Sequence, residues 1–141
     1  MAYLIFNNSN DLVKIAANDS DRDSLNLILT QHSVVSVSDS DFLKVRTGAS
    51  FASYDGTNAT ITEAENYFNE ESLKKYFENV VSLLNSFLSE NMDNSLYDDM
   101  NNYKNYLLSF DTSSITLPLN KSWEEYCNEN SIVFYHPLQI P

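Results

Sequence analysis

The spacing of hydrophobic positions changes along the chain. Up to about residue 62 they occur in short runs and alternations, and beyond it they recur at intervals of three and four residues. The first pattern is typical of strands and the second of amphipathic helices. The sequence therefore predicts an α+β fold in a single domain, residues 1–141. We expect a β-rich half with short helices at 1–62, an antiparallel helical hairpin at 63–111, and a short helix, strand and extended tail at 112–141.

Short elements are expected in the first half. Residues 2–6 predict a strand that a polar turn joins to a hairpin partner at 12–17, and residues 33–38 predict a third strand. Between them, apolar residues at helical spacing predict a helix over 20–29. A single helical turn is expected over 42–48, ending at the glycine.

The clearest local pattern lies at residues 50–62. Two β-prone arms flank the letters DGTN, in which Asp55 and Gly56 tolerate the positive φ angles of a tight turn. The stretch therefore predicts a β-hairpin. Thr62 followed by Glu65 has the spacing of a capping box, and this predicts that the helical half begins there.

Two amphipathic helices are predicted next, joined by the polar stretch 91–95. The stripe of the longer helix consists of Leu73, Tyr76, Phe77, Val80, Leu84, Phe87, Leu88 and Asn91. Because Tyr67 and Phe68 are out of phase with it, we expect a break near Asn69, which can cap the longer helix. The seam of the second helix consists of Leu96, Met100, Tyr103, Leu107 and Phe110. A short connection predicts antiparallel packing.

The last thirty or so residues predict an extended segment, a short helix and a strand. Pro118 disfavours helix in the residue before it. Ser122 and Glu125 repeat the capping spacing ahead of a short amphipathic helix at 123–127. Residues 131–141 predict a final strand that returns to the sheet and ends in an extended tail.

Charge narrows the classes of partner. The formal net charge is -12 with only 8 Lys and Arg residues, which disfavours phosphate backbones and anionic membrane surfaces and favours basic proteins. No apolar run approaches the roughly 20 residues of a bilayer span, and the N-terminus lacks the pattern of a signal peptide. The lone Cys127 cannot form an internal disulfide, so an intracellular folding environment is expected.

A run of alternating acids raises the possibility of a calcium site. These acids are Asp19, Asp21 and Asp23. An EF-hand loop starting there needs Gly at its sixth position and Glu at its twelfth, where this chain has Ser24 and Thr30. The capping interpretation explains more, because Ser20 can accept from the amide three residues later, and Ser38 with Asp41 repeats the device. We predict no cofactor and no metal, with the three acids as the alternative ligands.

Motifs for catalysis are missing. His32 and His136 have no neighbours at metal-ligand spacing, and Cys127 lies on an amphipathic turn that favours core packing. The chain has only 2 glycines, too few for a phosphate-binding loop. Adjacent acids point to different sides of a helix and therefore do not form a catalytic pair. The sequence predicts a protein that is not an enzyme.

Tyrosines and the C-terminal segment suggest protein contacts. Tyrosine is favoured at interfaces, where its ring is buried while its hydroxyl keeps a partner. The predicted partner-binding residues are Tyr97, Tyr103, Tyr106, Phe134, Tyr135, His136, Leu138 and Ile140. The alternative is that these tyrosines border an ordinary core and that the tail is disordered.

Three segments resemble small proteins of marine tailed bacteriophages, particularly cyanophages. They are MAYLIFNNSNDLVKIAANDSDRDSLN, SVVSVSDSDFLKVR and SWEEYCNENSIVFYHPLQIP. The resemblance implies a small protein that either belongs to the virion or acts on a host protein, and we expect a virion component of tail, baseplate, neck or capsid, made in the host cytoplasm. It would contact phage structural proteins or itself as a homo-oligomer, and neither nucleic acid nor membrane. The alternatives are an acidic inhibitor or DNA mimic that binds a basic host protein, and a calcium-dependent binding module.

Overall fold

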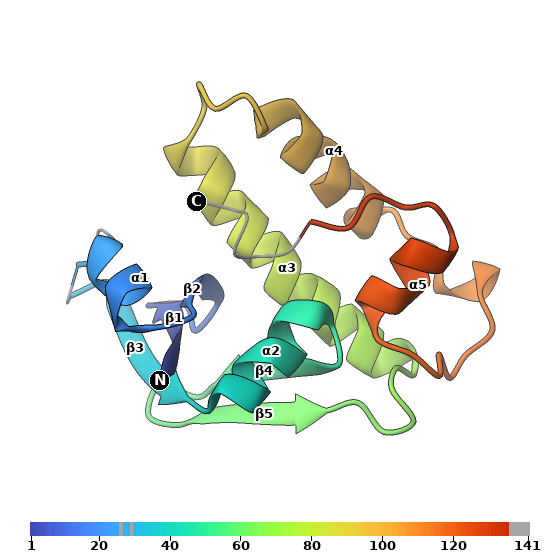
Figure 1. The fold of residues 1–141 in the computed structure, drawn as a ribbon, viewed down its shortest axis with the longest axis horizontal. Helices are drawn as coiled ribbons and strands as arrows, with labels where there is room; N and C mark the ends of the chain where they lie inside the picture. The colour runs from blue at the N-terminus through green and yellow to red at the C-terminus, as the bar shows by residue number, and fades with distance from the viewer. Residues whose placement is uncertain (26, 29, 136–141) are drawn as a thin grey trace.

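The computed structural model describes residues 1–25, 27–28 and 30–135. Within them lie five α-helices and two small antiparallel sheets, which confirms the predicted α+β fold. The longest helix lies between the sheets on one side and the remaining C-terminal helices on the other (Figure 1). None of the described helices combines the length and the apolar character that a membrane span requires.

The first sheet has three strands in the order β2-β1-β3. They are β1 (Ala2–Asn7), β2 (Leu12–Ala16) and β3 (His32–Val37), and all pairs are antiparallel. These strands confirm the three that the alternation predicted. Val35 is half-buried and faces the inner side of the sheet, whereas Val34 faces outwards and is 41% exposed.

The first helix is shorter than its hydrophobic spacing predicted. Helix α1 (Asp19–Ser24) is capped by Asn18, whose side chain accepts from the N–H of Asp21 at 2.8 Å, and the predicted cap at Ser20 is wrong. The amide of Asn18 is the acceptor because it lies one turn ahead of the first free N–H groups. Leu25 then leaves the helix in an extended conformation and packs on the outer face of the sheet. The predicted continuation beyond residue 24 is therefore wrong in the described residues.

Ser38 caps the next helix, as its spacing predicted. Helix α2 (Asp39–Thr47) begins with the Ser38 hydroxyl accepting from the N–H of Asp41 at 3.1 Å. It ends at Gly48, whose φ of 84° belongs to the left-handed region that favours glycine. The helix is longer than the single turn that the apolar residues predicted.

The second sheet is the predicted hairpin. Strands β4 (Ser50–Tyr54) and β5 (Ala59–Glu63) pair antiparallel, and the Asp55 carboxylate accepts from main-chain amides of the turn. The predicted capping box at Thr62 is wrong, because Thr62 lies inside β5 opposite Phe51. Pairing with β4 occupies this segment, and the helix begins only after a further turn.

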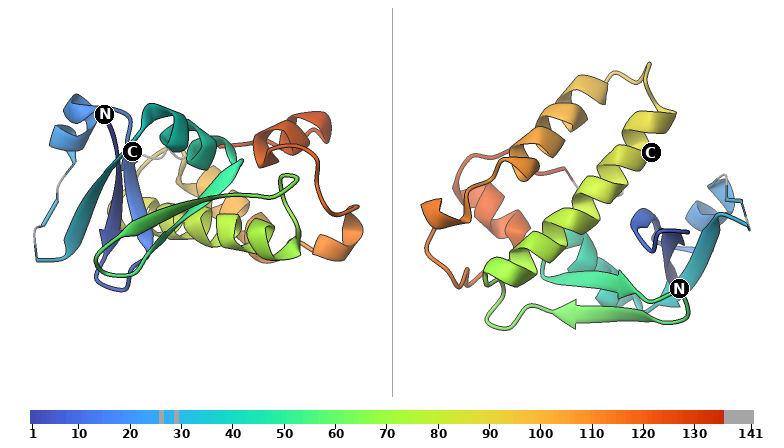
Figure 2. Two further views of the ribbon diagram at one scale, coloured as in Figure 1. Left: turned by 90° about the horizontal axis from the view of Figure 1, so that it is seen from below. Right: turned by 180° about the vertical axis from the view of Figure 1, so that it is seen from behind.

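Three helices form the second half. Helix α3 (Glu70–Glu90) is capped by Asn69, which confirms the predicted break, and Ser72 completes its capping box. Helices α4 (Tyr97–Leu108) and α5 (Trp123–Glu129) follow, with a 3-10 turn at Thr112–Ser114 between them. Figure 2 shows α4 and α5 on the side of α3 that faces away from the sheets. The predicted helical hairpin is the pair α3 and α4.

The C-terminal segment does not form the predicted strand over its described part. Ser131 has a φ of 57°, and the N–H of Ile132 donates to the carbonyl of Cys127 at 2.9 Å, so the chain turns back at the end of α5. Ile132, Phe134 and Tyr135 then pack against the helices instead of the sheet. Residues 136–141, which carried the rest of the prediction, lie outside the described residues.

Two large hydrophobic clusters fill the interior, and a small third one, with Tyr3, Ile5 and Ala16 as its buried members, lies on the outer face of the first sheet. The helical cluster has as its buried members Ala64, Phe68, Leu73, Tyr76, Phe77, Val80, Leu84, Phe87, Leu88, Met100, Tyr103, Leu107, Leu119, Trp123 and Cys127. The sheet cluster has as its buried members Ala2, Leu4, Phe6, Leu12, Ile15, Phe42, Val45, Ala52 and Leu83. Leu83 and Leu84 are neighbours on α3 but belong to different clusters, so α3 is the wall between them.

Candidate functional site

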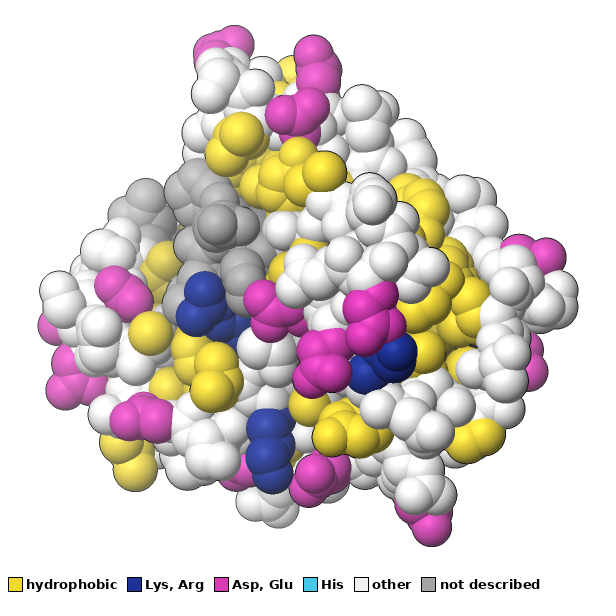
Figure 3. Space-filling view, turned by 45° about the vertical axis from the view of Figure 1, so that its right-hand side comes forward, with side chains coloured by type: hydrophobic (Ala, Val, Ile, Leu, Met, Phe, Trp, Pro, Cys, Tyr) yellow, Lys and Arg dark blue, Asp and Glu magenta, His cyan; other side chains and the backbone are white. Residues whose placement is uncertain are grey.

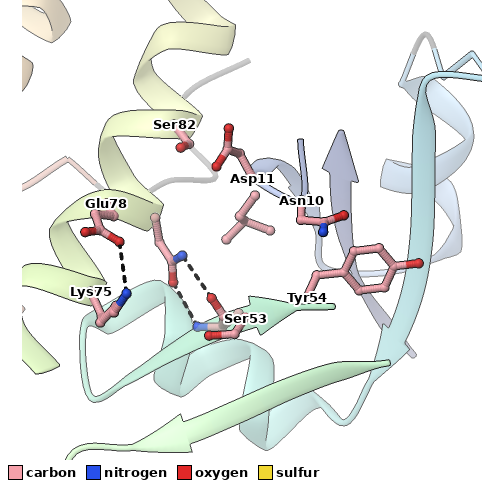
Figure 4. A pocket seen from close by; sticks show the side chains of 10 residues that line it. Asn10, Asp11, Ser53, Tyr54, Lys75, Glu78 and Ser82 are labelled. Carbon is pink, nitrogen blue, oxygen red and sulfur yellow. Dashed lines mark hydrogen bonds and ion pairs between the residues drawn. The ribbon is translucent and has the colours of Figure 1, made fainter. Parts of the chain in front are cut away.

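A polar cleft lies where the β1–β2 turn, strand β4 and helix α3 meet (Figure 4). Its volume is about 210 Å³. The lining residues are Asn10, Asp11, Leu12, Ala52, Ser53, Tyr54, Lys75, Glu78, Asn79 and Ser82. Hydroxyl, amide and charged groups from three separate elements therefore border one small hollow.

Asn79 does not offer its amide to a ligand in this cleft. Its Oδ1 accepts from the N–H of Ala52 at 2.8 Å, and its Nδ2 donates to the carbonyl of the same residue at 3.0 Å (Figure 4). The side chain thus pairs with β4 as another strand would, on the edge that β5 leaves free. The contact positions β4 against α3.

The charged groups of the cleft are solvated. Lys75 and Glu78 are 3.7 Å apart, and their side chains are 49% and 67% exposed. A pair of this kind contributes little, because water screens it. Asp11 from the turn and Ser82 from α3 border the cleft near each other (Figure 4). These groups can hydrogen-bond a polar molecule, but their arrangement lacks the nucleophile–base contact of a catalytic site.

A second polar hollow continues from the first along α3 and shares Asp11 and Ser82 with it. His32 also lines it, and its Nδ1 accepts from the N–H of Ile28 at 3.0 Å. That bond holds the turn before β3. The position of His32 is thus explained by local structure.

An apolar groove of about 260 Å³ lies between α3 and α4. Its lining residues are Lys74, Phe77, Glu78, Val81, Leu107, Leu108, Phe110 and Thr112. Leu108 is 62% exposed, which is high for a leucine. The apolar floor and charged rim resemble the composition of protein-binding grooves.

The groove was missed from the sequence, although a pattern for it exists. Val81 follows Val80, and Leu108 follows Leu107. Two adjacent apolar residues on a helix widen its apolar face beyond the stripe that packs inside. The stripes on the two helices were predicted, but the sequence pattern does not show that both widen at the same level.

The structure places one predicted partner-binding tyrosine in the core. Tyr103 is 5% exposed, and its hydroxyl accepts from the indole Nε1 of Trp123 at 3.1 Å. Burial raises the pKa of the Tyr103 phenol well above its usual value. The residue is therefore part of the interior and cannot present its ring on the surface of this fold.

The other predicted partner-binding residues lie at the edge of the helical cluster or outside the described chain. Tyr97, Tyr106, Phe134 and Tyr135 are partly buried and pack against that cluster. The ring of Tyr135 lies 5.4 Å from that of Tyr103. His136, Leu138 and Ile140 belong to the residues that the structure does not describe. The described members form a half-exposed aromatic border beside α4.

Cys127 is not a reactive nucleophile. Its side chain is 0% exposed in the helical cluster. Burial, and to a smaller extent the nearby charge of Glu124, raises the pKa of the thiol to about 12. The thiolate is the reactive form, and it is scarce at neutral pH under these conditions.

The three alternating acids are engaged separately. Asp19 accepts from the hydroxyl of Tyr3, and this hydrogen bond lowers the pKa of the Asp19 carboxyl. Asp23 pairs with Arg22 at 3.1 Å, and Asp21 occupies the first turn of α1. In the part of the chain that the structure describes, no group of three or more His, Cys, Asp or Glu side chains could hold a metal ion.

The described geometry thus offers two surfaces, a solvated polar cleft and an apolar groove, and no assembled catalytic centre among the residues that line them. Comparison with known proteins finds no matching protein family, no matching curated protein and no matching solved structure.

Proposed function

We propose that this chain is a non-enzymatic component of a bacteriophage virion that acts through protein–protein contacts. The observation that carries the contact role is the apolar groove between α3 and α4. The virion setting comes from the resemblance of three sequence segments to small proteins of marine tailed phages.

The groove has the features of a docking surface for another structural protein. Its floor contains Phe77, Val81 and Phe110, and the exposed Leu108 lies beside it. An apolar stripe on a partner helix can bury side chains in such a hollow, while Lys74 and Glu78 on the rim remain solvated. Because the groove is formed by two packed helices, its shape exists before the partner arrives, which reduces the entropy that binding costs.

The contacts of three potentially reactive side chains support a non-enzymatic role. The Cys127 thiol is buried with a raised pKa, and the Asn79 amide is paired with the main chain of Ala52. His32 holds a turn through its Nδ1. These three groups are therefore engaged in packing and local structure.

The net charge of -12 favours one alternative, an acidic inhibitor or DNA mimic that binds a basic host protein. A mimic needs carboxylates in a line that follows a phosphate backbone. On the face shown in Figure 3, acidic side chains are scattered singly and in small groups among hydrophobic patches. Steep weakening of binding by salt would favour the inhibitor over the virion component.

The test is mass spectrometry of purified phage particles that encode the chain, comparing the wild type with Leu108→Lys. We expect the wild-type chain in the particles, and the variant at a strongly reduced level, because the ammonium group would enter an apolar contact. Leu43→Lys is the matched control, since Leu43 is also an exposed helical leucine (53%) but lies on α2.

Absence of the wild-type chain from particles contradicts the proposal. If both variants enter the particles at the wild-type level, the virion role stands and the groove is not the contact surface. If Leu43→Lys alone is lost, the contact lies on the α2 side of the molecule.

A further inference from the structure

Strand β3 forms an open edge of the three-stranded sheet. The opposite edge strand, β2, packs against α3, whereas β3 lies on the side away from it (Figure 1). Within the described part of the chain, β3 pairs with β1 and with no other strand. Its residues include no Asp, Glu, Lys, Arg or Pro, the residue types with which proteins usually block such an edge.

Two hydrogen bonds at the start of the strand fix which groups point outwards. Asn7 lies opposite His32, yet the N–H of Asn7 donates to Asp11 and the N–H of His32 donates to Ile28, at 3.0 and 2.8 Å. Asn7 and His32 are therefore a non-hydrogen-bonded pair. Because bonded and non-bonded pairs alternate in an antiparallel ladder, Val34 and Ser36 direct their N–H and C=O groups away from β1.

We propose that two copies of this chain associate through β3, which pairs antiparallel with the β3 of the second copy. Val35 then lies beside the twofold axis. Val34 of one copy exchanges both main-chain hydrogen bonds with Ser36 of the other, and the symmetry repeats the exchange with the roles reversed. The result is one continuous sheet across the dimer.

This register follows from groups that are already engaged. With Val34 at the axis, Ser36 would face His32, whose N–H is donated to Ile28. With Ser36 at the axis, Val34 would face Ser38, whose carbonyl accepts from the N–H of Phe42 at 2.9 Å. Of these three registers, only the one with Val35 at the axis places both Val34 and Ser36 opposite residues whose outward N–H and C=O groups have no partner on that side in the described residues.

The side chains at this edge suit a second copy of the same chain. Copies that each carry a net charge of -12 repel, so they approach best where charge is absent. Val34 is 41% exposed, Ser36 is exposed, and neither is charged. A contact of this isologous kind closes on itself and gives a dimer instead of a growing fibre. It uses a surface other than the α3–α4 groove and does not depend on the proposed virion role.

The test is sedimentation of the purified chain over a range of concentrations. We expect a species of twice the 16.1 kDa chain mass, and more of it at high salt, because salt screens the repulsion. Val34→Lys introduces a charge at the pairing edge and is expected to weaken the dimer roughly tenfold or more. Val133→Lys is the matched control, since Val133 is an exposed valine (66%) outside the strand, and it should leave the dimer unchanged.

Two further measurements keep the outcome decisive. Ser36→Pro removes an outward N–H that an edge strand can lose without unfolding, and it should also give a monomer with an unchanged circular dichroism spectrum. Hydrogen exchange of the wild type should slow at the amides of Val34 and Ser36 as concentration rises, and not at Val35. A wild type that stays monomeric at high salt overturns the inference, as does a dimer that both variants leave intact.

Discussion

The helical cluster and the sheet cluster lie on opposite sides of α3 and are built differently. Aromatic rings dominate the helical cluster and meet edge-on around Trp123, with Phe77 at 4.8 Å and Phe110 at 5.3 Å between ring centroids. The sheet cluster is mainly aliphatic, and strand pairing positions it. The rings have fixed orientations, and Trp123 and Tyr103 share a buried hydrogen bond. The stability of the helical cluster therefore requires side chains that fit closely at its centre. The sheet cluster should tolerate loss of one side chain better, because its main-chain ladder remains.

The largest effect is expected from Trp123→Ala. The side chain is 0% exposed, so its loss should lower the free energy of unfolding by about 3–5 kcal/mol through lost burial and the cavity left behind. Urea denaturation followed by circular dichroism measures it. Leu12→Ala, at a buried position of the sheet cluster, is the comparison. A larger cost at Leu12 than at Trp123 would contradict the proposed difference between the clusters.

The next effect uses the two glycines as a matched pair. Both have positive φ, 84° at Gly48 and 95° at Gly56, so alanine at either should cost about 1–2 kcal/mol in backbone strain. At Gly48 the added Cβ would also lie 2.7 Å from Cβ of Trp123 and 3.0 Å from Cζ of Tyr76, whereas at Gly56 it would meet nothing within 4 Å. We therefore expect Gly48→Ala to cost about 1–3 kcal/mol more than Gly56→Ala. If the two variants have equal urea denaturation midpoints and slopes, the side chains around Gly48 move to accommodate the added methyl group.

The sequence predicted those parts of the fold in which one local pattern decides the structure. The α3 stripe and the Asp55–Gly56 turn are of this kind, because hydrophobic period and turn chemistry act within a few residues. Two of the wrong predictions arose where separate segments meet. Strand pairing with Phe51 removed Thr62 from the helix, and packing on the sheet drew Leu25 out of α1.

Candidate sites were harder to predict than the fold for the same reason. Tyr103 belongs to the predicted seam of the second helix and also has the residue type of an interface, and only the fold, in which it accepts from Trp123, decides between the two roles. The groove depends on Val81 and Leu108 lying at one level of two helices. The bridge between Phe68 and Leu119, which closes the helical cluster at one end, joins segments that no period connects.

A smaller effect is expected at the junction between the two clusters. Asn79→Ala removes the side chain that hydrogen-bonds both main-chain groups of Ala52, and it should cost about 1–3 kcal/mol because those groups lose their partners. Asn85→Ala is the control, since Asn85 is an exposed asparagine on the same helix, and its change should stay within about 0.5 kcal/mol. Thermal or urea unfolding distinguishes the two variants. Equal effects would mean that β4 does not need its contact with α3.

The smallest effect concerns pH at the exposed β4–β5 turn. Hydrogen bonds from the main-chain amides of Asn58 and Thr57 hold the pKa of the Asp55 carboxyl below its ordinary value of 3.8. Since the folded pKa is depressed, Asp55 stabilises the hairpin above the unfolded pKa, and this contribution is lost as pH falls through the folded pKa. Asp55→Asn keeps an acceptor oxygen and removes the charge, so its stability should approach that of the wild type at strongly acidic pH and fall below it at neutral pH. Titration of the Asp55 carboxyl by NMR measures the pKa directly. A value at or above 3.8 would show that the charge of Asp55 does not stabilise this turn. The hairpin contacts the sheet cluster through Tyr54, Ala59 and Ile61 near its turn, whereas Phe51 in β4 packs against the helical cluster, so loss of the Asp55 charge should disturb the sheet cluster first.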